Sequence, residues 1–499
     1  MKMVSAARTV VLFGIILQVT GFAKLLVIAD FFGAGPLLDA YYLALVIPTF
    51  LTGVSSGILQ TGFVPAYVAS RARGADDAAR TIANVTLTWT LLGLTAAAAL
   101  LCLLRGTALP LLAHGIAVPT QGALLPAYTL LMWMAPLNGL ADGAAMLLNA
   151  EGRFAAAASA PLLNVVVGIL VLFALRDLGI YALAWSLLAG LVAQALMVLA
   201  AIRLAGLSLR PRLTLQAAPG WLLAGIALPV LISNVLGNLV PALIQMVAAR
   251  AGTGSLSAMG YASRLHNSLV QAVVMSVSVI LLPHFARLMA QGRAAELRLS
   301  LERVFAATLL FAAASAVLVA AGGPVLIKLL LQRGTFTADD ARLVARVWLA
   351  LTAGLLGTTW GIFLARLFQA QQRPWVIATL ACVSVVVNAV LAMAFVSPWG
   401  VVGVAAASSL AYTLIMCLFH RRASRMLGGL VSSATGLFVA RALLANAAAY
   451  AIALWCRDML QEVGPVVVIA VQFGVVAATN VLLARTAPLR LTLRAMFGS

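Results

Sequence analysis

Three charged side chains lie inside or at the edge of long apolar runs, where charges are rare. Lys24 lies within the first run, Asp39 opens the second, and Arg264 lies early in a later one. A charge at membrane depth costs about 2.5–3.5 kcal/mol on insertion scales, so it usually faces a cavity or a partner. Two cations that face one cavity suit an anion, and a diphosphate is the natural candidate because Lys and Arg bind phosphate strongly at low dielectric. These residues therefore predict a site for a phosphate-bearing substrate.

Four further polar residues are candidates for a cavity or a gate. Asp142 lies within an apolar run and Arg366 near the end of another, while Asn149 and Arg153 flank a turn between two runs. Arg366 has a long side chain that could instead extend to the membrane interface, and the same holds for Arg441.

The three principal candidates also have structural alternatives. Lys24 and Arg264 could form ion pairs or extend to the interface. Asp39 could cap its own helix behind Pro36, because a carboxylate near a helix N-terminus accepts backbone N–H bonds and interacts favourably with the helix dipole. We favour binding for Lys24 and Arg264 because both lie far enough inside their runs to face the space between the lobes.

The chain lacks the motifs of nucleotide binding, metal binding and covalent catalysis. It has no P-loop and no Gly-rich nucleotide fingerprint. The four histidines lie near helix ends or loops, and the four cysteines show no CxxC spacing, so neither a metal site nor a disulfide framework is indicated. We predict no catalytic residue, no metal and no resident cofactor. If these charges bind a substrate that crosses the membrane, a coupling ion or the membrane potential would drive the movement.

Long apolar segments must position these charges. Of the 499 residues, 64% are hydrophobic and only 9% are charged, whereas a soluble chain has about 25% charged residues. A spanning helix needs about 20 apolar residues, so the sequence predicts an all-α polytopic membrane protein with about fourteen transmembrane helices. The predicted spans are 9–29, 37–68, 81–104, 124–149, 157–175, 180–202, 218–249, 256–286, 302–321, 341–370, 375–396, 401–420, 433–456 and 464–484.

The distribution of Lys and Arg predicts the orientation. With the N-terminus in the cytoplasm, 20 of the 32 basic residues fall in cytoplasmic segments and 8 in the opposite ones. Basic residues concentrate in short cytoplasmic loops, so we expect a multi-pass protein of the bacterial inner membrane with both termini cytoplasmic. The same pattern explains the net charge of +19 without a nucleic-acid partner.

A weak internal repeat runs through the chain. Pro65–Gly74 matches Pro283–Gly292 at an offset of 218 residues, and Asn149–Arg153 matches Gln369–Arg373 at an offset of 220. Pro, Gly and Arg carry these matches rather than the abundant Leu and Ala, so we interpret them as a true repeat.

The repeat predicts the domain organisation. We expect an N-lobe of six helices at 1–217, a C-lobe of six helices at 218–428, and a C-terminal helix pair with a cytoplasmic tail at 429–499. An even number of helices gives both lobes one orientation, which predicts a pseudo-two-fold axis along the membrane normal. At the first offset Asp39 aligns with Ser257.

No loop is long enough to hold a further domain. The longest are 105–123 and 322–340. In the second of these, the apolar stretch Pro324–Leu331 predicts a short interfacial helix.

Several short motifs give the chain a family resemblance. They are 21–24 with 32–35 and 39–42, then 63–65, 148–154, 261–265 with 281–283, and the most specific of them, Leu330–Asp339. Together these stretches resemble the MurJ/MviN lipid II flippases of the multidrug/oligosaccharidyl-lipid/polysaccharide exporter superfamily, and the resemblance spans most of the chain.

The resemblance implies a fold of fourteen helices whose central cavity opens alternately to each side. It also implies export of an undecaprenyl-diphosphate-linked sugar, with helices 13 and 14 forming a groove for the lipid tail. Lys24, Asp39 and Arg264 match charged cavity positions of the family, where Lys24 replaces the usual Arg. The family normally has an Arg and a Glu in the middle of helix 2, but Thr49–Gly57 contains neither, and Ser263 stands where an acid is common.

Our first hypothesis is a flippase that moves an undecaprenyl-diphosphate-linked glycan, lipid II or a related lipid-linked oligosaccharide, to the periplasmic leaflet by alternating access. An exopolysaccharide or O-antigen repeat unit is the alternative cargo. A multidrug/cation antiporter would need coupling carboxylates and a cavity suited to cations, against which Lys24 and Arg264 argue. A glycan polymerase or ligase would need a large extracytoplasmic loop with catalytic residues. We expect lipid-linked glycan and membrane lipids as partners, no nucleic acid, and a monomer.

Overall fold

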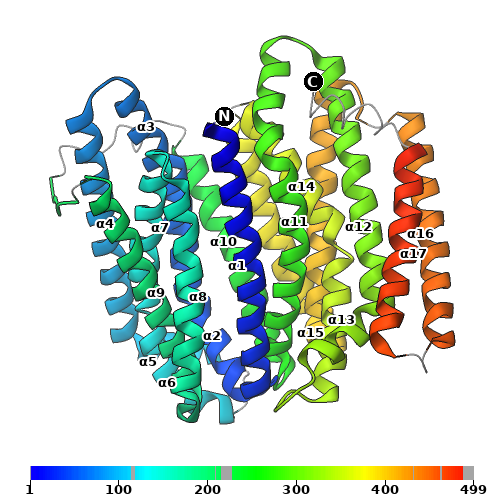
Figure 1. Ribbon diagram of the computed structural model, residues 1–499, viewed down its shortest axis with the longest axis horizontal. Helices are drawn as coiled ribbons and strands as arrows, with labels where there is room; N and C mark the ends of the chain where they lie inside the picture. Colours follow the sequence, from blue (N-terminus) through cyan, green and yellow to red (C-terminus); the bar gives the residue numbers. More distant parts are fainter. Residues whose placement is uncertain are drawn as a thin grey trace. The chain divides into compact units, whose positions relative to one another are not determined.

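The computed structural model describes residues 2–113, 118–207, 209–214, 227–371, 373–430, 432–460 and 464–486. Every regular element within these ranges is a helix (Figure 1). The helices divide into two compact units, Met1–Ser257 and Ala258–Ser499. The predicted lobe boundary at 217 lies outside the described residues, so the division into lobes at that point stays a prediction.

The first unit contains the helices of the N-terminal half. They are α1 (Lys2–Phe32), α2 (Pro36–Ile58), η1 (Leu59–Phe63), α3 (Val64–Ala72), α4 (Asp76–Leu103), α5 (Arg105–Ala113), α6 (Val118–Leu131), α7 (Met134–Ala150), α8 (Phe154–Ala174), η2 (Arg176–Leu178), α9 (Ile180–Leu204), α10 (Ala227–Ala248) and η5 (Ala249–Ala251). The π-helical turn η1 joins α2 to α3, so that Pro36–Ala72 forms one candidate membrane span.

The second unit contains the longer helices of the C-terminal half. They are α11 (Ser255–Ala290), which begins in the first unit, α12 (Ala294–Leu331), α13 (Ala338–Thr352), α14 (Leu355–Ala370), α15 (Pro374–Leu427), α16 (Ser433–Met459) and α17 (Pro465–Thr486). The 54-residue α15 breaks at Gly400, whose φ of 58° lies in the left-handed region that glycine tolerates.

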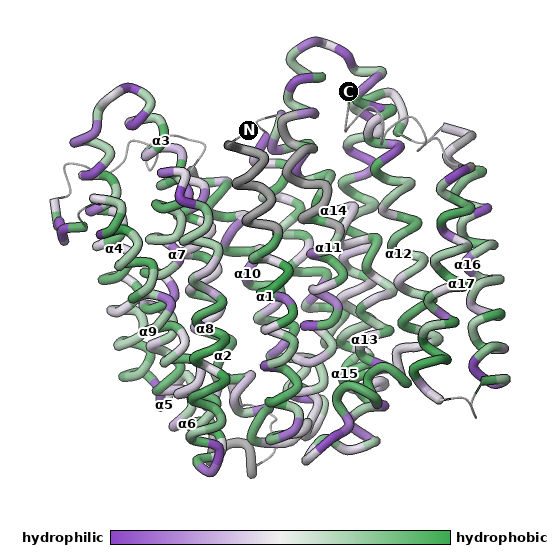
Figure 2. Tube along the Cα trace, viewed as in Figure 1, coloured by the Kyte–Doolittle hydropathy of each residue, from purple (hydrophilic) through white to green (hydrophobic). Residues whose placement is uncertain are grey.

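The prediction of a helical polytopic membrane protein is confirmed. Within the described ranges, 11 helices are long and apolar enough to cross a membrane, or up to 12 if the bent pair α13 and α14 is one span. Figure 2 shows hydrophobic residues along most of each helix and hydrophilic residues gathered towards the helix ends. The count of fourteen spans and the symmetry of the lobes stay predictions.

Two local predictions are wrong. The predicted loop at 105–123 contains a helix, since Arg105–Ala113 forms α5. The stretch Pro324–Leu331 is not a separate interfacial helix, because α12 continues through it to Leu331. Pro324 is accommodated within the helix, as happens in spanning helices where neighbours satisfy the backbone carbonyl that proline leaves without a donor.

The cores of the two units use positions that the repeat relates. Phe63 and Tyr67 lie in the first unit's core, and the residues 218 positions later, Leu281 and Phe285, lie in the second unit's core. The same correspondence holds at an offset of 220 for Leu148 and Phe368, among others. Corresponding positions of the predicted repeat are therefore buried in both units.

Helices α16 and α17 pack on α12 within the second unit. The buried Glu302 of α12 fixes the start of α16: its carboxylate accepts hydrogen bonds from the Ser432 backbone N at 3.1 Å and from the Ser432 and Thr435 hydroxyls at 3.1 Å each. Between α16 and α17, the Asn480 amide donates to Asn446 at 3.1 Å. The helix pair is thus held to the unit by specific polar contacts as well as by apolar packing.

Candidate functional site

A short turn places Asp39 in the first turn of α2. Gly33 closes α1 with φ of 57°, a left-handed conformation that suits glycine. Pro36 begins α2, where the fixed φ of proline is favourable and its missing N–H leaves no helical hydrogen bond unmade. Asp39 is then held in a buried position with only 6% of its surface exposed.

The Asp39 carboxylate caps a different helix from its own. One oxygen, Oδ2, accepts a hydrogen bond from the Gly254 backbone N at 2.5 Å. The other, Oδ1, accepts from the backbone N of Ser257 at 2.7 Å and from its hydroxyl at 2.6 Å. These donors lie at the start of α11, whereas Gly35, the N-cap of α2, makes no side-chain cap bond. Asp39 therefore connects α2 to the start of α11 through short, charge-assisted bonds.

Lys24 lies where α1 packs against α8. A Cβ atom added to Gly168 of α8 would come within 2.6 Å of the Lys24 ammonium nitrogen, so a larger residue at this position would displace the end of the Lys24 side chain. The Ser186 hydroxyl of α9 donates a hydrogen bond to the Gly168 carbonyl at 2.7 Å. Among the described residues Lys24 forms no ion pair. Its charge is consequently not neutralised by any described carboxylate of the protein.

Arg264 lies on α11 in the second unit and is exposed. Its carbonyl accepts a hydrogen bond from the Ser268 hydroxyl, but its guanidinium forms no ion pair with a described residue. Lys24 and Arg264 belong to different units, so their meeting in one cavity stays a prediction.

Asp142 connects α7 to the last turn of α2. The Ser56 hydroxyl donates to its carboxylate at 2.5 Å, and the Asn138 amide lies 3.5 Å from the same oxygen. Both Asp142 and Lys24 lie in the first unit, but no ion pair joins them. The structure thus places Asp142 in a neutral hydrogen-bonding environment.

Two glycines of α2 face asparagines of α10. A Cβ atom at Gly57 would lie 2.7 Å from Cγ of Asn234, and one at Gly53 would lie 2.7 Å from Cγ of Asn238. The sequence analysis did not select this contact, although the Gly-x-x-x-Gly spacing of Gly53 and Gly57 permits close helix approach in membranes and could have indicated it. It lies in the stretch where the family resemblance would place an Arg and a Glu, so α10 packs against a small, uncharged face of α2.

Asn149 and Arg153 are exposed residues at the turn between α7 and α8. The residue of this turn that makes specific contacts is Glu151, which the sequence interpretation did not select. Its carboxylate accepts from the Tyr67 hydroxyl at 2.5 Å and from the Arg71 guanidinium at 2.9 and 3.0 Å. Burial alone would raise the pKa of Glu151, but the hydrogen bonds from Tyr67 and Arg71 outweigh it and hold the pKa below its ordinary value.

Arg366 is the remaining candidate, and it bonds within its own helix. Its guanidinium donates to the Gln369 side chain at 2.8 Å on α14. Of the sequence-predicted residues, the structure thus places Lys24, Asp39, Asp142, Asn149 and Arg153 in the first unit, and Arg264 and Arg366 in the second.

Comparisons with known proteins agree with the fold. A sequence profile described as lipid II flippase MurJ matches residues 28–473. The chain is 28% identical over 402 residues to the lipid II flippase MurJ of Burkholderia cenocepacia, covering 74% of each chain. It is 25% identical over 474 residues to the probable lipid II flippase MurJ of Vibrio cholerae, covering 89% of this chain and 87% of that one.

Solved structures show the same architecture. A lipid II flippase MurJ in an inward closed conformation superposes with a TM-score of 0.79 at 18% identity, covering 95% of this chain and 98% of that one. An inward-facing multidrug resistance MATE family transporter gives a TM-score of 0.68 at 16% identity, covering 83% and 94%.

The helical fold, with charged side chains inside apolar helices, is that of a polytopic membrane protein and matches the folds of the MurJ and MATE transporters. Because the matched profile covers most of the sequence, the chain belongs to the lipid II flippase MurJ family. It is accordingly a multi-pass protein of the bacterial inner membrane.

Proposed function

We propose that this protein translocates an undecaprenyl-diphosphate-linked glycan, lipid II or a related lipid-linked oligosaccharide, from the cytoplasmic to the periplasmic leaflet by alternating access. The observation that carries the proposal is the family match over residues 28–473, shared with relatives described as lipid II flippases. The distribution of Lys and Arg supports cytoplasmic termini, and the proposed functional unit is a single chain.

Lys24 and Arg264 are the proposed ligands of the diphosphate. Neither forms an ion pair with a described residue, and a charge at membrane depth costs about 2.5–3.5 kcal/mol on insertion scales. A diphosphate bound by both would offset that cost, because a phosphate accepts charge-assisted hydrogen bonds from ammonium and guanidinium groups.

Asp39 is the proposed conformational latch. Its bonds to Gly254 and Ser257 hold the start of α11 against α2. A transporter that alternates between two states needs contacts that form in only one of them. Breaking these three hydrogen bonds would release the start of α11 from α2, so Asp39 stabilises the state in which they are made.

A flipping assay in proteoliposomes tests the proposal. We expect Lys24→Ala and Arg264→Ala to abolish translocation of a labelled lipid-linked glycan while leaving the protein folded and inserted, and Lys24→Arg to retain activity because it keeps the cation. Arg441→Ala is the matched control, since it removes a cation from the exposed face of α16. Wild-type rates in both alanine variants would reject the diphosphate role.

The cargo is tested in the same assay. Labelled lipid II and a labelled undecaprenyl-diphosphate exopolysaccharide unit are supplied separately to the wild-type protein. Translocation of lipid II would support lipid II as the cargo. Translocation of the exopolysaccharide unit alone would identify the cargo as a related lipid-linked oligosaccharide. Failure to move either one would overturn the proposal.

A further inference from the structure

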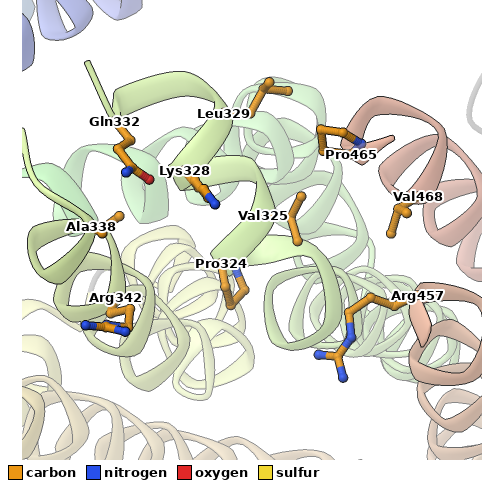
Figure 3. A pocket seen from close by; sticks show the side chains of 11 residues that line it. Pro324, Val325, Lys328, Leu329, Gln332, Ala338, Arg342, Arg457, Pro465 and Val468 are labelled. Atoms are coloured by element: carbon orange, nitrogen blue, oxygen red, sulfur yellow. The ribbon is translucent and has the colours of Figure 1, made fainter. Parts of the chain in front are cut away.

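A cavity of about 900 Å³ lies in the second unit, at the ends of four helices (Figure 3). It is bordered by the last turns of α12 and α16 and by the first turns of α13 and α17. Its volume falls in the range of ligand sites, roughly 300–1,000 Å³. None of the residues proposed to bind the transported glycan lines it.

The walls of this cavity combine apolar surface with positive charge. Pro324 and Val325 of α12 and Pro465 and Val468 of α17 supply apolar walls. Three cationic side chains line the same space, each from a different helix, and the described lining contains no acidic residue. They are Lys328 of α12, Arg342 of α13 and Arg457 of α16.

The cations are only partly compensated by acids outside the cavity. Arg342 pairs with Asp339, whose side chain is 83% exposed, and Arg457 pairs with Asp458 at 3.0 Å. Exposed pairs of this kind are weak, since both partners remain hydrated. Lys328 forms no ion pair within the described part of the chain. The cavity thus presents net positive charge.

Helix-end preference explains only part of this arrangement. A cation in the last turn of a helix interacts favourably with the helix dipole, which accounts for Lys328 and Arg457. Arg342 lies near the N-terminal end of α13, where the dipole does not favour a cation. The dipole also gives no reason for three cations from three helices to line one cavity.

We propose that this cavity binds the headgroup of an anionic phospholipid, with the phosphate near Lys328 and Arg457 and the acyl chains along the neighbouring apolar surface. That surface is present on both sides: Leu329 is 43% exposed on α12, and Val466 is 63% exposed on α17. Basic pockets between membrane helices are known to bind the headgroups of anionic lipids such as cardiolipin. A lipid fits better than free phosphate because the apolar walls would contribute nothing to a small ion.

The site lies within one unit and does not depend on the proposed transport cycle. Charge complementarity and the exposed apolar flank make an anionic phospholipid the favoured occupant over the transported lipid, whose proposed diphosphate ligands lie elsewhere. The predicted orientation puts this end of the helices at the periplasmic leaflet.

Titration of the purified full-length protein in phosphatidylcholine nanodiscs with a fluorescent phosphatidylglycerol tests the proposal. We expect saturable binding of phosphatidylglycerol, weakened about fivefold by Lys328→Gln and about fivefold by Arg457→Gln, as one surface cation contributes. Arg457→Lys keeps the charge and should bind nearly as well as wild type. Arg176→Gln is the matched control, because Arg176 also pairs with the acid that follows it, Asp177, but lies outside the cavity.

Three outcomes would overturn the proposal. The first is equal binding of fluorescent phosphatidylcholine, and the second is competition by inorganic phosphate as effective as by phosphatidylglycerol. The third is binding of undecaprenyl diphosphate but not of phosphatidylglycerol, which would assign the cavity to the transported lipid. We expect Lys328→Gln to flip labelled glycan at the wild-type rate. That result would show that the variant is folded. It would also separate a failure of the phospholipid proposal from a failure of the transport proposal.

Discussion

Replacing Asp39 by Asn is the most direct test of the latch. The change keeps the shape of the side chain but removes the charge and one of the two acceptor oxygens. The carboxylate holds three hydrogen bonds, two from backbone N–H groups and one from a hydroxyl. Hydrogen bonds to a charged group contribute about 1.5–3 kcal/mol, and a buried donor left without a partner costs about 1–3 kcal/mol. We expect the latched state to lose about 2–4 kcal/mol.

This free-energy change has a measurable consequence. Since 1.4 kcal/mol corresponds to a tenfold change in an equilibrium constant, a loss of about 2 kcal/mol raises the opening of the latch about 30-fold. Hydrogen–deuterium exchange at the backbone N–H groups of Gly254 and Ser257 reports that opening, because these two groups donate to Asp39. Exchange there should be about 30-fold faster in Asp39→Asn, or faster still.

Asp142→Asn supplies the matched control for this experiment. It neutralises a second acid of the same unit, one that bonds to Ser56 rather than to the start of α11. Exchange at Gly254 and Ser257 should therefore stay at the wild-type rate in this variant. Equal exchange rates at Gly254 and Ser257 in the wild type and in Asp39→Asn would refute the latch. Equally faster exchange in Asp39→Asn and Asp142→Asn would instead show that either substitution destabilises the whole unit.

Three further predictions concern stability and one concerns orientation. Because the pKa of Glu151 is depressed in the folded state, the ionised carboxylate stabilises the fold fully above the ordinary pKa of 4.5, and this stabilisation is lost as the pH falls through the lower folded-state pKa. The thermal midpoint of unfolding should therefore decrease on acidification in this pH window. In Glu151→Gln the midpoint should depend less on pH. Gly57→Ala should destabilise by about 1–3 kcal/mol through overpacking, and a second change, Asn234→Ala, should restore part of the midpoint. Glu302→Ala should reduce the free energy of unfolding by about 1–3 kcal/mol and speed proteolysis at the start of α16. Unchanged cleavage would show that the hydrogen bonds of Glu302 do not hold the start of α16 in place. A cysteine at the exposed Thr335 should react with an impermeant reagent from outside intact spheroplasts, and labelling only after permeabilisation would reverse the proposed topology.

The fold was largely predictable because membrane insertion depends on composition over long windows. A run of apolar residues specifies a helix whatever its neighbours are, since every backbone group must be satisfied within the bilayer. The repeat stays a prediction, and paired core positions such as Phe63 and Leu281 agree with it. The end of α12 was predicted wrongly because the predicted span ended at residue 321, whereas the helix continues through Pro324 to Leu331.

The contacts of the candidate residues were much less predictable. Asp39 was selected as a charge at a helix start, but two of its three donors are backbone N–H groups, which carry no sequence signal. Ser257 was indicated only as the residue that aligns with Asp39 in the repeat. Glu151 was missed because an acid in a turn between helices usually lies in solvent, and its partners Tyr67 and Arg71 are distant in sequence.

The C-terminal part of α2 affects how far binding of the diphosphate depends on Lys24. In this stretch Ser56 bonds to Asp142, while Gly53 and Gly57 face the asparagines of α10, so no cation extends from α2 at this depth. The Arg that the family resemblance would place here is absent, and a larger side chain at Gly53 would meet Asn238. Other basic residues lie within the described candidate spans of the first unit, but each is close to a span end, whereas Lys24 lies deeper in its own span. They are Arg71, Arg80, Arg203 and Arg250. If the diphosphate is bound as proposed, no second cation of this unit can substitute for Lys24, so its removal should abolish transport rather than reduce it.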